Sequence, residues 1–219
     1  MTVIFACTFP GGAAIAADTL LHNPDTMQPV KNSPKVLSIS PRVAIAQAGS
    51  FNGTQSIWDK LEQLPPASAT PTSVADAIME YGHPIYRRKS AIEPTMMRYL
   101  VAGLEADGVP AIRWLEFDTE KFGGVSGECQ IAARGTLPNV QEIANVALRG
   151  SLKSISNIVR LDEWCRRVVA AEATASPQAV GFPAILIVMK QTGGFGKQIG
   201  PEEAPEPAYE VFWPYGPRL

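Results

Sequence analysis

The chain has 219 residues, of which 46% are hydrophobic and 18% are charged, and its formal net charge is −2. This composition indicates a globular protein with one sizeable core, and the near-neutral charge argues against partners such as nucleic acid or an anionic membrane. No uninterrupted apolar run reaches the roughly 18–20 residues that a membrane-spanning helix needs.

The N-terminal stretch is apolar but does not resemble a secretory signal. It lacks a basic region and is interrupted by Pro10-Gly11-Gly12, so we expect it to belong to the folded protein in the cytoplasm. Cys7, Cys129 and Cys165 are odd in number and far apart, which predicts reduced, buried thiols. With only two histidines, they show no metal-ligand spacing, and we expect no metal and no cofactor.

The first part of the chain predicts short strands followed by a helix. The expected elements are a β-hairpin at 3–17, a polar loop at 21–33, strands at 35–39 and 43–48, and a helix that Ser50 caps. Alternating apolar residues indicate the strands, and an apolar stripe at helical spacing indicates the helix.

The remainder predicts a second helix, further strands, two more helices and a last strand. The expected elements are a helix from Ser73 that Pro84 kinks or ends, strands at 96–104, 111–117 and 123–133, helices at 139–148 and 154–172, a strand at 184–189, and a turn at Gly193-Gly194. We expect one domain over 1–199 and a Pro-rich C-terminal tail over 200–219.

Strands and helices occur in blocks, which argues against a doubly wound parallel sheet. We expect an α+β protein, a four-layer αββα sandwich of two mainly antiparallel sheets.

The N-terminus suggests a nucleophile. Thr2 follows the initiator Met1, so removal of Met1 would place a hydroxyl and a free α-amine on one residue. The amine has a reference pKa of about 7.7–8.0 and is a base suited to neutral pH. Alone, this observation is also compatible with an ordinary second residue.

Several segments resemble a known family when they are taken in order. They are Met1-Thr2, Ala16-Ala17-Asp18-Thr19, Lys31-Asn32-Ser33-Pro34-Lys35-Val36, and Ala44-Ile45-Ala46-Gln47-Ala48-Gly49. Over residues 2–64 the chain resembles the proteasome β-type subunits, which are N-terminal nucleophile hydrolases. The Met-Thr start is similar to that of the bacterial heat-shock peptidase and of smaller bacterial proteasome homologues.

The resemblance implies a catalytic set in which Thr2 attacks a peptide carbonyl, Asp18 pairs with Lys35, and the Gly49 amide binds the oxyanion. Thr136 stands where the family often has a serine that orients the N-terminal amine. The family's acid in the loop after the last long helix has no counterpart at 173–182, which contains no Asp or Glu.

Gln47 and His22 are the expected substrate-binding residues, at the pocket before the cleaved bond and beside the extended substrate. Taken singly, each of these positions also has a structural interpretation, such as a turn aspartate, a solvated lysine or an exposed histidine.

The resemblance predicts a threonine peptidase acting on peptides or unfolded protein. The expected partners are identical subunits in a ring or double ring and an ATP-dependent unfoldase. Two alternatives are an N-terminal-threonine amidase or acylase acting on a small amide, and a catalytically silent scaffold subunit.

Overall fold

The computed structural model describes residues 2–23, 26, 28–49, 57–61, 63–151 and 160–202. These residues form three antiparallel sheets. The first sheet has the strand order β10-β1-β2-β11-β12. Its strands are β1 (Ile4–Phe9), β2 (Gly12–Asp18), β10 (Ile131–Arg134), β11 (Ala184–Lys190) and β12 (Gly193–Ile199).

The second sheet has the order β5-β6-β7-β8-β9, and the third is the two-stranded ribbon β3-β4. The strands are β3 (Leu20–His22), β4 (Pro29–Asn32), β5 (Val36–Ser40), β6 (Val43–Gly49), β7 (Met97–Leu104), β8 (Pro110–Glu116) and β9 (Lys121–Ser126). The helices with described bounds are η1 (Pro66–Ser68), α2 (Pro71–Ser90), α3 (Val140–Gly150) and α4 (Leu161–Ala175).

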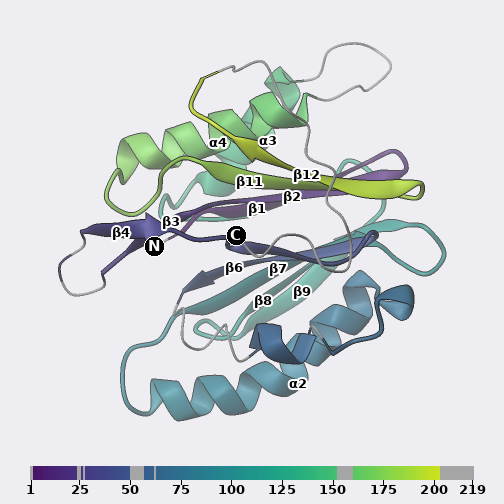
Figure 1. The fold of residues 1–219 in the computed structure, drawn as a ribbon, viewed down its shortest axis with the longest axis horizontal. Helices are drawn as coiled ribbons and strands as arrows, with labels where there is room; N and C mark the ends of the chain where they lie inside the picture. Colours follow the sequence, from purple (N-terminus) through teal and green to yellow (C-terminus); the bar gives the residue numbers. More distant parts are fainter. Residues whose placement is uncertain are drawn as a thin grey trace.

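Figure 1 shows the two five-stranded sheets facing each other, with α3 and α4 beside the first sheet and α2 beside the second. Much of the layer between the sheets is alanine. Its buried alanines are Ala6, Ala13, Ala17, Ala44, Ala46, Ala48, Ala102 and Ala132. Small side chains let two sheets approach closely, and polar groups at the ends of the strands then come within reach of the opposite sheet.

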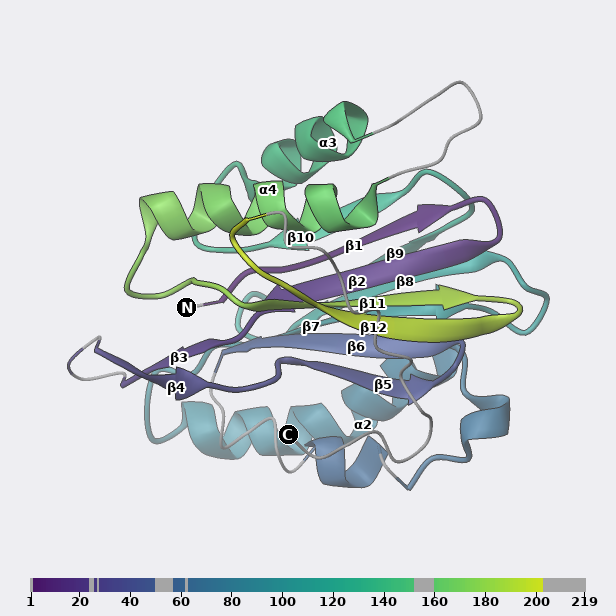
Figure 2. The same ribbon diagram turned by 45° about the horizontal axis from the view of Figure 1, so that its top comes forward.

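The ribbon β3-β4 projects beyond the ends of the larger sheets (Figure 2). Leu20 lies opposite Asn32 in its register. The Ser33 N–H donates to the Thr19 carbonyl at 2.7 Å, at the base of the ribbon.

The predicted four-layer αββα sandwich of two sheets is wrong as stated. The described residues contain a third sheet, because 21–33, predicted as a loop, contributes both ribbon strands. The segment is polar and carries prolines, so it lacks the apolar alternation that signals a strand; main-chain pairing forms the ribbon instead.

The predicted strand at 123–133 is in fact two strands in different sheets, β9 and β10. Gly127 has φ +99° and Cys129 has φ +60°, and such residues interrupt an extended strand. The predicted hairpin at 3–17 and the helix at 139–148 are present as β1-β2 and α3.

Helix α2 starts before Ser73 and continues past Pro84 to Ser90. Thr70 caps it, and Ser73 supplies the reciprocal bond. The start of the helix expected at Ser50, residues 154–159 of the helix predicted at 154–172, and most of the predicted tail lie outside the described residues. No helix among the described residues combines the length and apolarity needed to cross a bilayer.

Candidate active site

Asp18 and Lys35 form a buried ion pair at the base of the β3-β4 ribbon. Lys35 Nζ donates to Asp18 Oδ2 at 2.8 Å and to the Leu20 carbonyl at 2.7 Å. Asp18 is 0% exposed and Lys35 is 4% exposed. Burial lowers the pKa of the Lys35 ammonium, and the Asp18 carboxylate opposes that shift. The carboxylate therefore favours the charged form of a lysine held inside the protein.

The same carboxylate holds the start of strand β1. The Val3 N–H donates to Asp18 Oδ1 at 3.1 Å, and the Asp18 N–H donates to the Val3 carbonyl at 3.3 Å. Because the Val3 nitrogen belongs to the peptide group that Thr2 begins, Asp18 fixes the main chain next to the candidate nucleophile. Thr2 itself is 8% exposed. The main chain after Thr2 and the Lys35 ammonium therefore both contact the Asp18 carboxylate, at one end of the sheets.

Strand register extends this group to Thr136. Ile4, the first residue of β1, pairs with Arg134, the last residue of β10, so Thr2 and Thr136 each lie two residues beyond this last pair, at the same edge of the sheet. The Thr136 Oγ1 is buried and has no hydrogen-bond partner within the described part of the chain. A buried hydroxyl without a partner is uncommon, and such a hydroxyl can still form a hydrogen bond with an additional polar group.

Glu172, on the last turns of α4, is a residue of this region that the sequence analysis missed. It is 0% exposed, and its carboxylate accepts hydrogen bonds from the Thr136 and Leu137 amides, each at 3.1 Å. The search for an acid covered only 173–182, after the helix. The sequence pattern that could have identified Glu172 is an acidic residue on the core-facing side of an amphipathic helix.

Gly49 ends β6, opposite Met97 of β7. Its φ is +118°, and a Cβ at this position would lie 2.0 Å from the Met96 carbonyl oxygen. The chain therefore requires glycine here for two independent reasons. The start of the helix expected to follow, whose first N–H groups would complete an oxyanion site, lies outside the described residues, and the chain is helical at 57–61.

Gln47 lies two residues before Gly49 and is tied to Lys35 through the main chain. Its N–H donates to the Lys35 carbonyl at 2.9 Å, and its Oε1 is buried and has no partner among the residues that the structure describes. The alternation along β6 puts its side chain on the same face as Ile45, which packs toward α2. This observation places Gln47 near the group and leaves its role in substrate binding a prediction.

His22 is on strand β3, at the part of the ribbon away from the sheets. Burial lowers the pKa of His22, and the positive charges of the chain N-terminus and of Lys35 lower it further. These charges place His22 within electrostatic reach of the site, and its role in substrate binding also stays a prediction.

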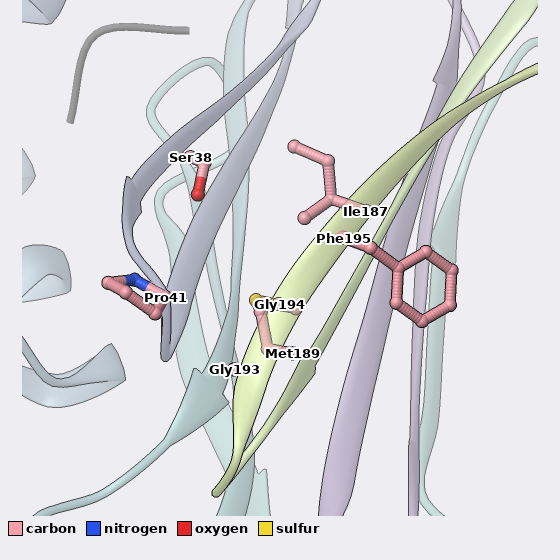
Figure 3. Close-up of a pocket in the computed structure, with 7 residues that line it drawn as sticks. All are labelled: Ser38, Pro41, Ile187, Met189, Gly193, Gly194 and Phe195. Atoms are coloured by element: carbon pink, nitrogen blue, oxygen red, sulfur yellow. The ribbon is translucent and has the colours of Figure 1, made fainter. Parts of the chain in front are cut away.

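A cavity of about 200 Å³ lies at the other end of the sheets, beside the β5-β6 and β11-β12 turns (Figure 3). Its lining residues are Ser38, Pro41, Ile187, Met189, Gly193, Gly194 and Phe195. The Ser38 hydroxyl donates to the Ser40 carbonyl, so it is already engaged. The cavity contains none of the predicted site residues.

The prediction of three buried thiols is wrong for one of them. Cys7 and Cys165 are buried, whereas Cys129 is exposed, and all three are unpaired. Cys129 lies between β9 and β10, where the chain leaves one sheet for the other.

Comparison with known proteins gives a likeness of fold. The chain is similar to a chain of the structure described as the helical assembly of the Anbu complex from Pseudomonas aeruginosa. The TM-score is 0.70 and the identity 14%, over 92% of this chain and 88% of that one. No protein-family model and no curated protein sequence matches.

The predicted membership of the proteasome β-type subunit family is therefore corrected. The structural likeness, at 14% identity, shows a shared fold and no more, and no sequence match assigns a family. The short segments that carried the resemblance are too few for a family assignment over the whole chain. Roles for the site residues consequently depend on the geometry described above.

Proposed function

We propose that the chain is a proteasome-like threonine peptidase whose nucleophile is the N-terminal residue that remains after Met1 is removed. The observation that carries the proposal is the position of the buried Asp18 carboxylate, which binds both the Thr2–Val3 peptide group and the Lys35 ammonium. This contact holds the main chain beside Thr2 in a fixed position relative to the buried ion pair.

In the proposed reaction the Thr2 hydroxyl attacks the carbonyl carbon of a peptide bond. The α-amine of Thr2 takes the hydroxyl proton and later passes it to the leaving amine. The product is an ester on Thr2 Oγ1, which water hydrolyses. The Lys35 charge disfavours a second positive charge nearby, so it helps to keep the α-amine neutral and able to accept a proton.

Two further groups complete the proposed site. The Gly49 amide donates to the oxyanion, and loss of such a donor typically slows a reaction by about 10²–10³-fold. The Thr136 hydroxyl orients the α-amine, which supplies the partner that this buried oxygen lacks among the described residues.

We also propose that identical subunits assemble around the site. The similar structure is that of a helical assembly, which favours a homo-oligomer over a monomer. Placement in the cytoplasm agrees with three unpaired cysteines. The ring stoichiometry and an unfoldase partner stay predictions of the sequence.

The decisive test combines the mass of the N-terminus with activity. We expect intact mass spectrometry to find Met1 absent and an epoxyketone probe, which requires a free amine and a hydroxyl, to label Thr2. Thr2→Ala should abolish cleavage of fluorogenic peptides without changing assembly, and Thr2→Ser should retain part of it. Thr8→Ser, at the far end of β1, is the matched control and should be fully active.

Other outcomes assign other functions. A retained Met1 together with normal assembly would indicate a scaffold subunit, because the nucleophile would have no free amine. Probe labelling of Thr2 without cleavage of any peptide would indicate an amidase or acylase. Undiminished peptide cleavage by Thr2→Ala would refute the proposal.

A further inference from the structure

The strand that carries Thr2 is flanked by two strands that are each tied to the opposite sheet by an ion pair. On one side, Asp18 of β2 binds Lys35, which directly precedes β5. On the other side, Arg134 of β10 binds Glu116 of β8 through its Nε. Strand β1 lies between β10 and β2 in the first sheet, while β6 and β7 lie between β5 and β8 in the second.

The Arg134–Glu116 pair joins two defined rows of residues. In the first sheet, Arg134 lies opposite Ile4 of β1. In the second sheet, Glu116 lies opposite Arg98, which lies opposite Ala48, the residue before Gly49. The pair therefore links the row two residues from Thr2 to the row one residue from Gly49.

Both carboxylate oxygens of Glu116 are engaged, one by Arg134 and the other by Thr119. Glu116 is 5% exposed and receives the bond from the Thr119 hydroxyl at 3.0 Å. Arg98 is 3.9 Å from Glu116 but makes its close contact with Asp118, at 2.6 Å. Arg134 also lies over the Trp114 ring, 5.7 Å from its centroid, and this contact holds the guanidinium from the side of the second sheet.

We propose that Glu116 is a positioning residue for the reaction: through Arg134 it sets the spacing of the two sheets at their active-site end. The inference rests on the proposed function, because it concerns the distance between the Thr2 hydroxyl on one sheet and the Gly49 amide on the other. The Asp18–Lys35 pair ties one flank of β1 to the second sheet, and without Glu116 the other flank loses its ion pair to that sheet.

Loss of the bridge should slow the chemical step more than it weakens substrate binding. Misplacement by about 1 Å between reacting groups costs up to about 10²-fold in rate. Substrate that pairs with strand edges keeps those contacts when the sheets shift relative to each other.

The experiment compares Glu116→Gln with wild type in peptide cleavage. We expect kcat to fall about 10- to 100-fold with KM changed less than about threefold, at a temperature where both proteins are fully folded. Arg134→Met should produce the same loss, Arg134→Lys should recover part of it, and Glu116→Gln with Arg134→Met should be no worse than either alone.

Glu105→Gln is the matched control. It removes the Arg113–Glu105 ion pair, in which Glu105 follows β7 at the other end of the second sheet and Arg113 belongs to β8. We expect its kcat to equal that of wild type. If Glu116→Gln does not fold, the Arg134→Met and Arg134→Lys comparison provides the test.

The outcomes separate the two proposals. If wild type shows no cleavage that depends on Thr2, the proposed function fails and the positioning role fails with it. If Thr2-dependent cleavage is present but Glu116→Gln and Arg134→Met keep wild-type kcat, the positioning role alone is refuted. An equal fall of kcat in Glu105→Gln would also refute it, because any lost ion pair would then have the same effect.

Discussion

The Glu172 carboxylate lies against the α-carbon of Gly135, where an added methyl group would be 2.2 Å from Oε1. The same carboxylate binds the next two amides, those of Thr136 and Leu137. A residue of helix α4 thereby holds the main chain that follows β10. The glycine is required because the acid approaches so closely.

Gly135→Ala should destabilise the protein by displacing Glu172 from these amides. A buried donor left without a partner costs about 1–3 kcal/mol, so we expect a loss of that order in the free energy of unfolding, measured by urea denaturation. Gly150→Ala is the control: its methyl would meet the Arg167 guanidinium at 2.3 Å, but that side chain can move. Equal losses in the two variants would contradict the assigned role of Glu172.

Asp18→Asn should destabilise the protein by leaving Lys35 buried without its counter-charge. Breaking a buried pair in this way typically costs about 3–5 kcal/mol. Burial then lowers the pKa of Lys35 further, since the carboxylate that opposed the shift is gone.

The sign of the pH dependence follows from that pKa. Between the lowered folded value and the ordinary value of Lys35, the unfolded chain binds more protons, so stability rises with pH in this window. We therefore expect the Lys35 contribution to the deficit of Asp18→Asn to be smaller near pH 10 than at pH 7. Urea midpoints at the two pH values measure it, and a deficit that grows with pH would contradict the argument.

Gly49→Ala should be more destabilising than a glycine replacement at an open turn. Gly49 and Gly127 both have positive φ, +118° and +99°, so alanine is strained at either site by about 1–3 kcal/mol. Only at Gly49 does the methyl also meet backbone, the Met96 carbonyl, whereas nothing lies within 4 Å at Gly127. Urea denaturation of the two variants should show the larger loss for Gly49→Ala; equal losses would show that the close approach is easily relieved.

Alkylation of the native protein by a maleimide should label Cys129 alone. Burial raises the pKa of the Cys7 and Cys165 thiols well above the usual range, so they remain protonated as well as inaccessible. Mass spectrometry of tryptic peptides should find the other two labelled only after denaturation. Rapid labelling of Cys165 in folded protein would indicate that α4 opens locally.

Local patterns predicted much of the secondary structure and part of the site. The alternation in 3–17 and the turn at Pro10-Gly11-Gly12 predicted the β1-β2 hairpin that the structure contains. Asp18 and Lys35 were predicted as a pair because their segments resemble those of the proteasome β-type subunits. The structure places them 2.8 Å apart, and their part in catalysis stays a prediction.

Patterns failed where main-chain pairing or distant contacts decide the structure. The ribbon β3-β4 has no apolar face, so no periodicity revealed it. The two halves of 123–133 belong to different sheets because Gly127 and Cys129 have positive φ values, which the residue types alone did not predict. Glu172 was missed because only the packing of α4 determines which amides its carboxylate meets.

By itself, the sequence determined which side chains near the N-terminus could take part in a reaction and which short segments form strands or helices. Both depend on side-chain type and local spacing. Only the tertiary structure decided that Asp18 reaches the Thr2–Val3 peptide, that Glu116 meets Arg134, and that Glu172 meets the Thr136 amide. These contacts join residues that are distant in the sequence; Thr136 and Glu172, for example, are 36 residues apart. Of these groups, Asp18 and Glu116 also bind a cation from the opposite sheet, because the two alanine-lined sheets pack closely enough for buried charges to meet across the gap.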